Sequence, residues 1–109
     1  MKTTETGRTA EAEVAKFLKA GKYSIVAQNW RTRTCEIDII AKKDGVVYFV
    51  EVKYRSSNAQ GDGFAYVTVR KQHQMRYAAE VWVQENDGDG DYRLMAAAVS
   101  EQGVSILEL

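Results

Sequence analysis

The chain contains no proline, one cysteine, one histidine and no net charge at neutral pH. Because one cysteine cannot form an intrachain disulfide, stability must come from a packed core, and we expect a reducing, cytoplasmic location. No apolar run approaches the ~20 residues of a membrane-spanning helix, and the first residues lack the apolar core of a signal peptide. We therefore expect no contact with a membrane.

The length and composition suit an ordinary globular protein. With 109 residues, 45% of them apolar and 28% charged, we expect one domain over residues 1–109. The charges are unevenly spread: residues 31–76 carry nine basic and five acidic side chains, whereas residues 77–109 carry one and seven. A positive middle segment suits contact with a phosphate backbone, although solvated charges that merely vary along the chain explain the same counts.

Hydrophobic periodicity predicts two helices and five strands. Apolar residues at helical spacing, Ala10, Val14, Phe17 and Leu18, favour a helix over Glu5–Ala20, and a second helix is expected over Val69–Gln84. Ser56–Gly63 is typical of a polar loop. The predicted strands are Tyr23–Gln28, Cys35–Ala41, Val46–Arg55, Tyr92–Val99 and Val104–Leu109. This order, αβββαββ, predicts an α/β sandwich in which two helices flank a central mixed five-stranded sheet.

The second and third strands form a hairpin that brings charged residues together. Asp44-Gly45 favours a two-residue turn, which places Asp38 opposite Glu51 and Glu36 opposite Lys53. Opposed residues share a face, as do residues two apart on one strand, so all four side chains are expected on one side of the sheet. The opposed Cβ atoms would lie about 5 Å apart.

Two opposed carboxylates repel each other unless something compensates their charge. Either one of Asp38 and Glu51 keeps its proton through a raised pKa, or a divalent cation bridges them. Oxygen ligands without cysteine or histidine favour Mg²⁺ or Mn²⁺. Glu36 and Lys53 have a purely structural explanation as an ion pair. Glu11 falls inside the apolar arc of the first helix, where it acts either as a salt-bridge partner or as support for a metal site.

Glu36-Ile37-Asp38, followed by Glu51-Val52-Lys53 at the end of an apolar strand, resembles the signature of the PD-(D/E)xK nuclease superfamily, whose core has the same order of elements. More narrowly, nearly the whole chain is similar to the YraN family, bacterial proteins that are similar to Holliday junction resolvases. The matching segments include Gly7-Arg8 with Glu11, the run from Glu36 to Ala41, the run from Phe49 to Lys53, and Lys71-Gln72.

The resemblance implies a metal-dependent endonuclease with a restriction-endonuclease-like fold, which hydrolyses phosphodiester bonds in DNA, including branched or damaged DNA. It implies that Asp38 and Glu51 hold Mg²⁺ or Mn²⁺ together with the Val52 carbonyl, that Glu11 supports the metal, and that Lys53 orients the attacking water. Candidates for nucleic-acid contact are Arg31, Arg33, Arg55, Lys71 and Gln72, with Glu36 in a supporting position. Residues placed like Lys71 and Gln72 are more often ordinary helix-edge residues.

Two alternatives to this function stay open at this point. The domain could bind nucleic acid or a protein partner without cutting, or it could be a toxin or restriction-type nuclease domain. The superfamily resemblance also implies a homodimer on branched DNA.

Overall fold

The computed structural model of the chain describes residues 3–55, 64–86 and 90–109, with side chains described from Thr9 onward. The predicted loop Ser56–Gly63 lies outside these residues. The elements are α1 (Thr3–Ala20), β1 (Ser24–Arg31), β2 (Glu36–Lys43), β3 (Val46–Tyr54), α2 (Val69–Glu85), β4 (Tyr92–Ser100) and β5 (Gly103–Glu108). The predicted α/β order is therefore confirmed, and the largest difference is that β1 runs three residues further than the predicted strand.

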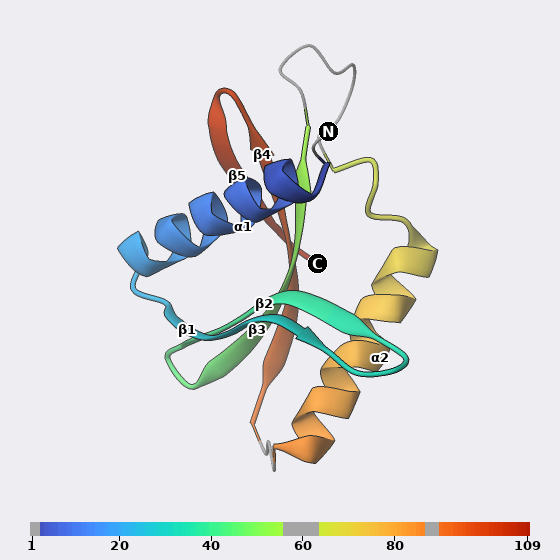
Figure 1. The fold of residues 1–109 in the computed structure, drawn as a ribbon. Helices are drawn as coiled ribbons and strands as arrows, with labels where there is room; N and C mark the ends of the chain where they lie inside the picture. The colour runs from blue at the N-terminus through green and yellow to red at the C-terminus, as the bar shows by residue number, and fades with distance from the viewer. Residues whose placement is uncertain (1–2, 56–63, 87–89) are drawn as a thin grey trace.

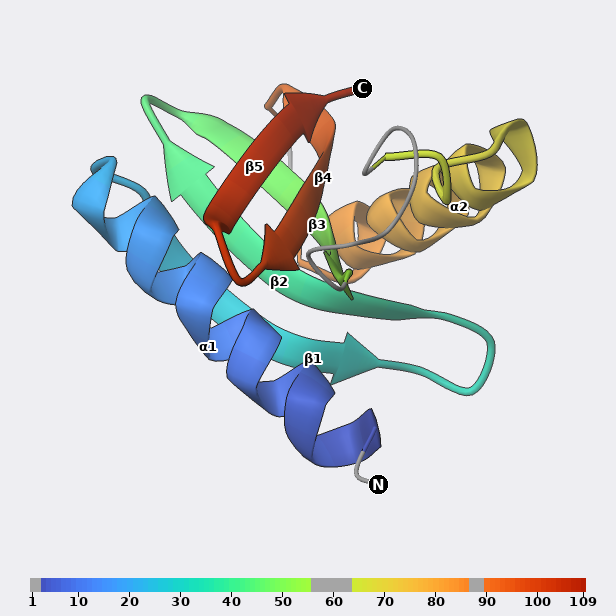
Figure 2. The same ribbon diagram turned by 90° about the horizontal axis from the view of Figure 1, so that it is seen from above.

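One mixed sheet, in the order β1-β2-β3-β4-β5, organises the molecule. Neighbouring strands are antiparallel except for β3 and β4, which are parallel and are connected through α2. The two helices lie on opposite faces of this sheet (Figures 1 and 2). Within the described residues, neither helix is long and apolar enough to cross a membrane.

Each helix covers its own cluster of buried side chains. The α1 side contains Ile39 and Val50, whereas the α2 side contains Ile40 and Phe49. Adjacent residues of β2 and β3 are thus buried on opposite faces, as expected for central strands covered on both sides. In α1 the contact with the sheet is made by Val14, Ala15 and Leu18, whereas Phe17 is 47% exposed.

Local chemistry fixes the ends of the elements that frame the site. Asp44 and Gly45 have φ values of 53° and 81°, the left-handed pair that a tight hairpin between β2 and β3 requires. Thr68 caps α2, where its side-chain oxygen accepts a hydrogen bond of 3.1 Å from the Lys71 backbone N–H. The turn therefore fixes the β2–β3 hairpin, and the Thr68 cap fixes the start of α2.

Candidate active site

The β2–β3 hairpin is regular near its turn and irregular at Asp38. Its pairs follow the predicted register as far as Ile39–Val50, where the ladder of the described residues ends. The predicted backbone pairs Asp38–Glu51 and Glu36–Lys53 are therefore not formed. The turn sets the register correctly, but the two strands separate one residue before the acids.

On the β1 side the Asn29–Asp38 pair is not formed, although the register of β1 and β2 is the same before and after it. The pairs that flank it are Gln28–Ile39 and Trp30–Ile37, and Asn29 between them has a φ of 54°. Ile37 packs on the α2 side whereas Ile39 packs on the α1 side, although residues two apart in a regular strand share a face. The assumption of regular alternation, which placed Glu36 and Asp38 on one face, fails here.

The Asp38 carboxylate fills the space between the separating strands. The Val52 backbone N–H donates a hydrogen bond of 2.8 Å to Asp38 Oδ2, so a side chain replaces the missing backbone partner. Burial raises the pKa of Asp38 from 3.8 to about 7, and the charges of Glu51, Glu11 and Glu36 act in the same direction, while the Val52 bond opposes them. Asp38 is thus half-buried, held in place and costly to ionise without a cation.

Glu11 reaches the same place from α1. Its side chain is half-buried, and burial raises its pKa, while a hydrogen bond from the Asn29 side chain lowers it and the charges of Glu36 and Glu51 raise it. The left-handed Asn29 therefore has a second role, because its amide holds Glu11 beside the break in β2. The four predicted acids form one electrostatic cluster, which we call the acidic cluster: Glu11, Glu36, Asp38 and Glu51.

Two of these acids are already paired with cations. Lys71 Nζ in the first turn of α2 lies 3.4 Å from Glu51 Oε2, and the nearer Arg31 nitrogen lies 3.6 Å from Glu36 Oε1. Lys71 therefore faces the acidic cluster rather than solvent alone. Lys53 is exposed, two residues after Glu51 on β3, and it makes no ion pair with any residue that the structure describes.

The remaining predicted contacts are scattered around this centre. Arg33 is exposed in the β1–β2 connection, and Gln72 is half-buried in α2 without joining the acidic cluster. Arg55 is half-buried where β3 ends, and its backbone N–H donates to the Val99 oxygen at 2.8 Å. The structure thus brings Lys71 and Arg31 to the acids but gives Arg33 and Gln72 no contact with them.

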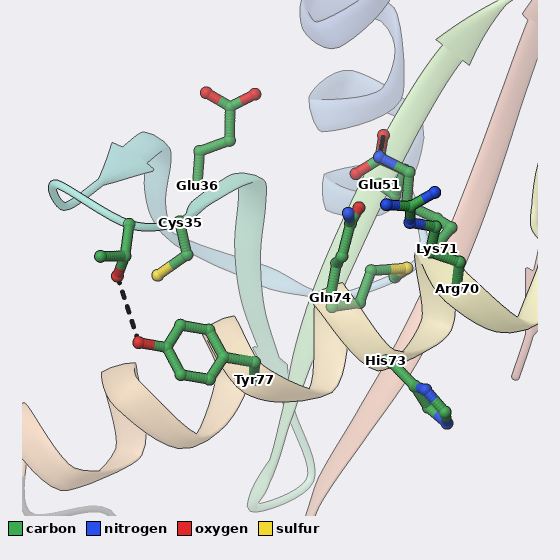
Figure 3. Close-up of a pocket in the computed structure, with 10 residues that line it drawn as sticks. Cys35, Glu36, Glu51, Arg70, Lys71, His73, Gln74 and Tyr77 are labelled. Carbon is green, nitrogen blue, oxygen red and sulfur yellow. Dashed lines mark hydrogen bonds and ion pairs between the residues drawn. The ribbon is translucent and has the colours of Figure 1, made fainter.

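A cavity of about 510 Å³ opens beside Glu51, between the start of β2 and one side of α2 (Figure 3). Its α2 wall carries basic and amide side chains, and its other wall carries Glu36 and Cys35. Tyr77 spans the two walls, because its hydroxyl hydrogen-bonds with Thr34 Oγ1 at 3.2 Å. The full lining is Thr34, Cys35, Glu36, Glu51, Arg70, Lys71, His73, Gln74, Met75 and Tyr77.

The prediction gave no role to Asn29 or to Tyr66. The Tyr66 hydroxyl donates to the Ala97 oxygen at 3.4 Å, and burial together with the charges of Glu51 and Asp38 raises its pKa. Tyr66 therefore lies within electrostatic reach of the acids. The Asn-Trp-Arg sequence at 29–31 carries a weak signal, since asparagine tolerates the left-handed conformation that strand residues avoid. Tyr66 carries none, because only the fold brings it near Asp38.

The donor set suits a hard divalent cation. All candidate ligands are oxygens: the carboxylates of Asp38 and Glu51, and the Val52 carbonyl, which points to the same side of β3 as the N–H that bonds Asp38. No group of three or more histidine, cysteine, aspartate and glutamate side chains among the described residues is arranged to hold a metal ion. Mg²⁺ commonly takes only one or two carboxylates and completes its shell with water and phosphate, so the residues present fit it.

Comparison with known proteins identifies the family. The sequence model of "Uncharacterised protein family UPF0102" matches residues 10–108. The chain belongs to the UPF0102 family. This confirms the YraN-like resemblance over most of the sequence, including the segments that carry the acidic cluster.

Curated relatives share the same family name. A UPF0102 protein of Rhodopseudomonas palustris is 43% identical over 82% of this chain and 67% of its own length. Others come from Chloroherpeton thalassium, with 38% identity over 85% of this chain and 73% of its own length, and from Lachnoclostridium phytofermentans, with 39% identity over 73% and 68%. Each match covers about two thirds or more of both proteins, so the similarity extends over most of the fold.

Proposed function

We propose that this UPF0102 chain is a metal-dependent endonuclease that hydrolyses phosphodiester bonds in DNA. The observation that carries the proposal is the state of Asp38: a half-buried carboxyl with a pKa of about 7, within charge range of three further carboxylates. Such a cluster is unfavourable unless a proton or a cation neutralises it, and perturbed carboxyls of this kind gather at functional sites.

In this proposal Asp38 and Glu51 hold Mg²⁺ or Mn²⁺ with the Val52 carbonyl. The ion, when bound, lowers the pKa of a coordinated water and offsets charge on the transferring phosphoryl group. Lys53 orients the attacking water, since its exposed ammonium follows Glu51 on the same strand and has no competing ion pair in the described part of the chain. Glu11 supports the site through its bond with Asn29.

The surroundings favour a polyanionic substrate. Basic side chains that border the acidic cluster include Arg31, Arg70 and Lys71. Arg55 lies within electrostatic reach of Tyr66. Lys71 pairs with Glu51 in the structure, so a cation held by Glu51 would release the Lys71 ammonium for a phosphate oxygen. A cytoplasmic location and a homodimer on branched DNA remain predictions of the sequence, and size-exclusion chromatography with light scattering, with and without DNA, tests the second.

Cleavage of a DNA panel tests the proposal. Linear, branched and single-stranded substrates are incubated with Mg²⁺, with Mn²⁺ and with EDTA. We expect metal-dependent cleavage that Asp38→Asn, Glu51→Gln and Lys53→Met reduce by at least about 100-fold, because each removes a ligand or a charge from the reacting centre. Glu13→Gln is the matched control, since Glu13 is an exposed acid of α1, and it should leave cleavage unchanged.

One observation favours a second candidate, a module that binds nucleic acid without cutting it. The ion pair between Lys71 and Glu51 neutralises one of the two proposed ligands. If this pair is purely structural, DNA should bind equally well in EDTA and in Mg²⁺, and none of the substrates should be cut. Binding measured beside cleavage in the same panel therefore separates the two functions.

A further inference from the structure

The cavity beside Glu51 is larger than a metal site requires. Its volume of about 510 Å³ falls within the ~300–1,000 Å³ of small-molecule pockets. Glu51 and its cationic partner Lys71 both line the cavity. Tyr77 also lines it and lies further along the same helix as Lys71. Tyr77 lies six positions after Lys71 on α2, a rise of about 9 Å along the helix. The cavity therefore extends well beyond the proposed reacting phosphate.

The chemistry of the side chains that line the cavity changes along its length. Arg70, Gln74 and Tyr77 follow one another at intervals of four and three residues, so they form one stripe along α2, and all three line the cavity (Figure 3). The stripe begins with a guanidinium, continues with an amide and ends with an aromatic ring. This order matches a nucleotide that places its phosphate near Arg70 and Lys71 and its base near Tyr77.

The ring of Tyr77 is exposed and is held in one orientation. The residue is 52% exposed, so its ring is not part of the core, and its hydroxyl bond to Thr34 Oγ1 ties it to the β1–β2 connection. An exposed aromatic held in one orientation offers a base a stacking surface at low entropic cost. Met75, only 7% exposed, adds apolar contact area from the same helix.

We propose that this cavity receives one unpaired nucleotide adjoining the scissile phosphate, with its base stacked on Tyr77. The inference rests on the proposed nuclease function and names its substrate class: DNA with an unpaired nucleotide at a branch, bulge or single-stranded end. A base inside a continuous duplex is stacked and paired on both sides, so it cannot enter a cavity between a helix and a sheet unless it leaves the stack. An already unpaired base enters without that cost.

Fluorescence of 2-aminopurine tests binding without cleavage. The probe base is placed either in a fully paired duplex or as a single-nucleotide bulge in the same sequence, and wild-type protein is added in EDTA. We expect tighter binding and a fluorescence change only with the bulge. Tyr77→Ala should weaken bulge binding at least about fivefold, the lower end of base–aromatic stacking, while Tyr77→Phe, which keeps the ring, should retain it. Phe17→Ala removes an equally exposed aromatic from α1 and should have no effect.

Cleavage of the same two DNAs in Mg²⁺ separates the possible failures. Both proposals are supported if the wild type cuts the bulge faster than the duplex and if Tyr77→Ala cuts the bulge only at the duplex rate. Equal cutting of both DNAs, unaffected by Tyr77→Ala, overturns the nucleotide cavity and leaves the nuclease standing. Tyr77-dependent bulge binding without any cutting supports the cavity and refutes the nuclease. Equal binding of both DNAs in every variant, without cutting, overturns both.

Discussion

Replacing Asp38 with asparagine should stabilise the metal-free protein above neutral pH. Asparagine keeps an oxygen that accepts the Val52 N–H but carries no charge, so the half-buried site no longer has to hold an anion. This outcome would be unusual, since most substitutions of half-buried, hydrogen-bonded residues destabilise a protein.

The pKa of Asp38 sets the sign and size of the effect. Because its pKa in the folded protein, about 7, lies above its ordinary value of 3.8, the folded state binds more protons than the unfolded state between these values. The wild-type protein therefore loses stability as the pH rises from ~4 to ~7, and the loss is complete above ~7. At ~1.4 kcal/mol per pKa unit the full displacement corresponds to ~4 kcal/mol. Water screens a half-buried group, so we expect ~2 kcal/mol at pH 8.

Urea unfolding in EDTA at several pH values measures this difference. The free energy of unfolding of Asp38→Asn minus that of the wild type should be smallest near pH 4 and should grow to its maximum above pH 7. Glu13→Gln should show no such trend. The reasoning is refuted if Asp38→Asn is less stable than the wild type at pH 8, or if the difference does not change with pH. Mn²⁺ should reverse the order, because it stabilises only the protein that retains the ligand.

Three further substitutions test the fold and the support of the site. Phe49→Ala should cost about 3–5 kcal/mol in urea unfolding, because the ring is 1% exposed and contacts two other aromatic rings edge-on. Thr68→Ala should cost about 1 kcal/mol through loss of the α2 cap, measured in the same way. Asn29→Gly keeps the left-handed backbone but removes the amide that holds Glu11, so cleavage should fall about 10- to 100-fold while thermal stability changes little.

The sequence was sufficient for the architecture because its strongest signals are local. Asp44-Gly45 specifies a turn, the turn specifies a register, and the observed pairs follow that register as far as Ile39–Val50. The apolar run of β3 and the capped start of α2 are equally local. The same local rules predicted a short β1, because the polar residues Gln28 and Asn29 end its apolar pattern, although hydrogen bonding to β2 continues to Arg31.

The sequence was insufficient where the site departs from regular structure. It brought Glu36, Asp38 and Glu51 into one hairpin. It gave no indication that Asp38 forms no backbone pair with either neighbouring strand, or that its side chain replaces a backbone acceptor. In sequence Lys71 is more typical of an ordinary helix edge than of a phosphate contact. Its 3.4 Å contact with Glu51 depends on how α2 packs on the sheet. Such contacts between distant segments have no local signature.

The parallel pairing of β3 with β4 has a consequence for folding. The α1 helix and the first three strands are joined by short connections, so their contacts close quickly, whereas the parallel pair must wait until the long segment that contains α2 has crossed the sheet. The carboxylates all belong to the early part, and Lys71, Arg70 and Tyr77 belong to the late one. We expect amides of α2 to exchange with deuterium sooner than those of the β2–β3 hairpin, so that the carboxylates stay together after the α2 wall of the cavity has opened.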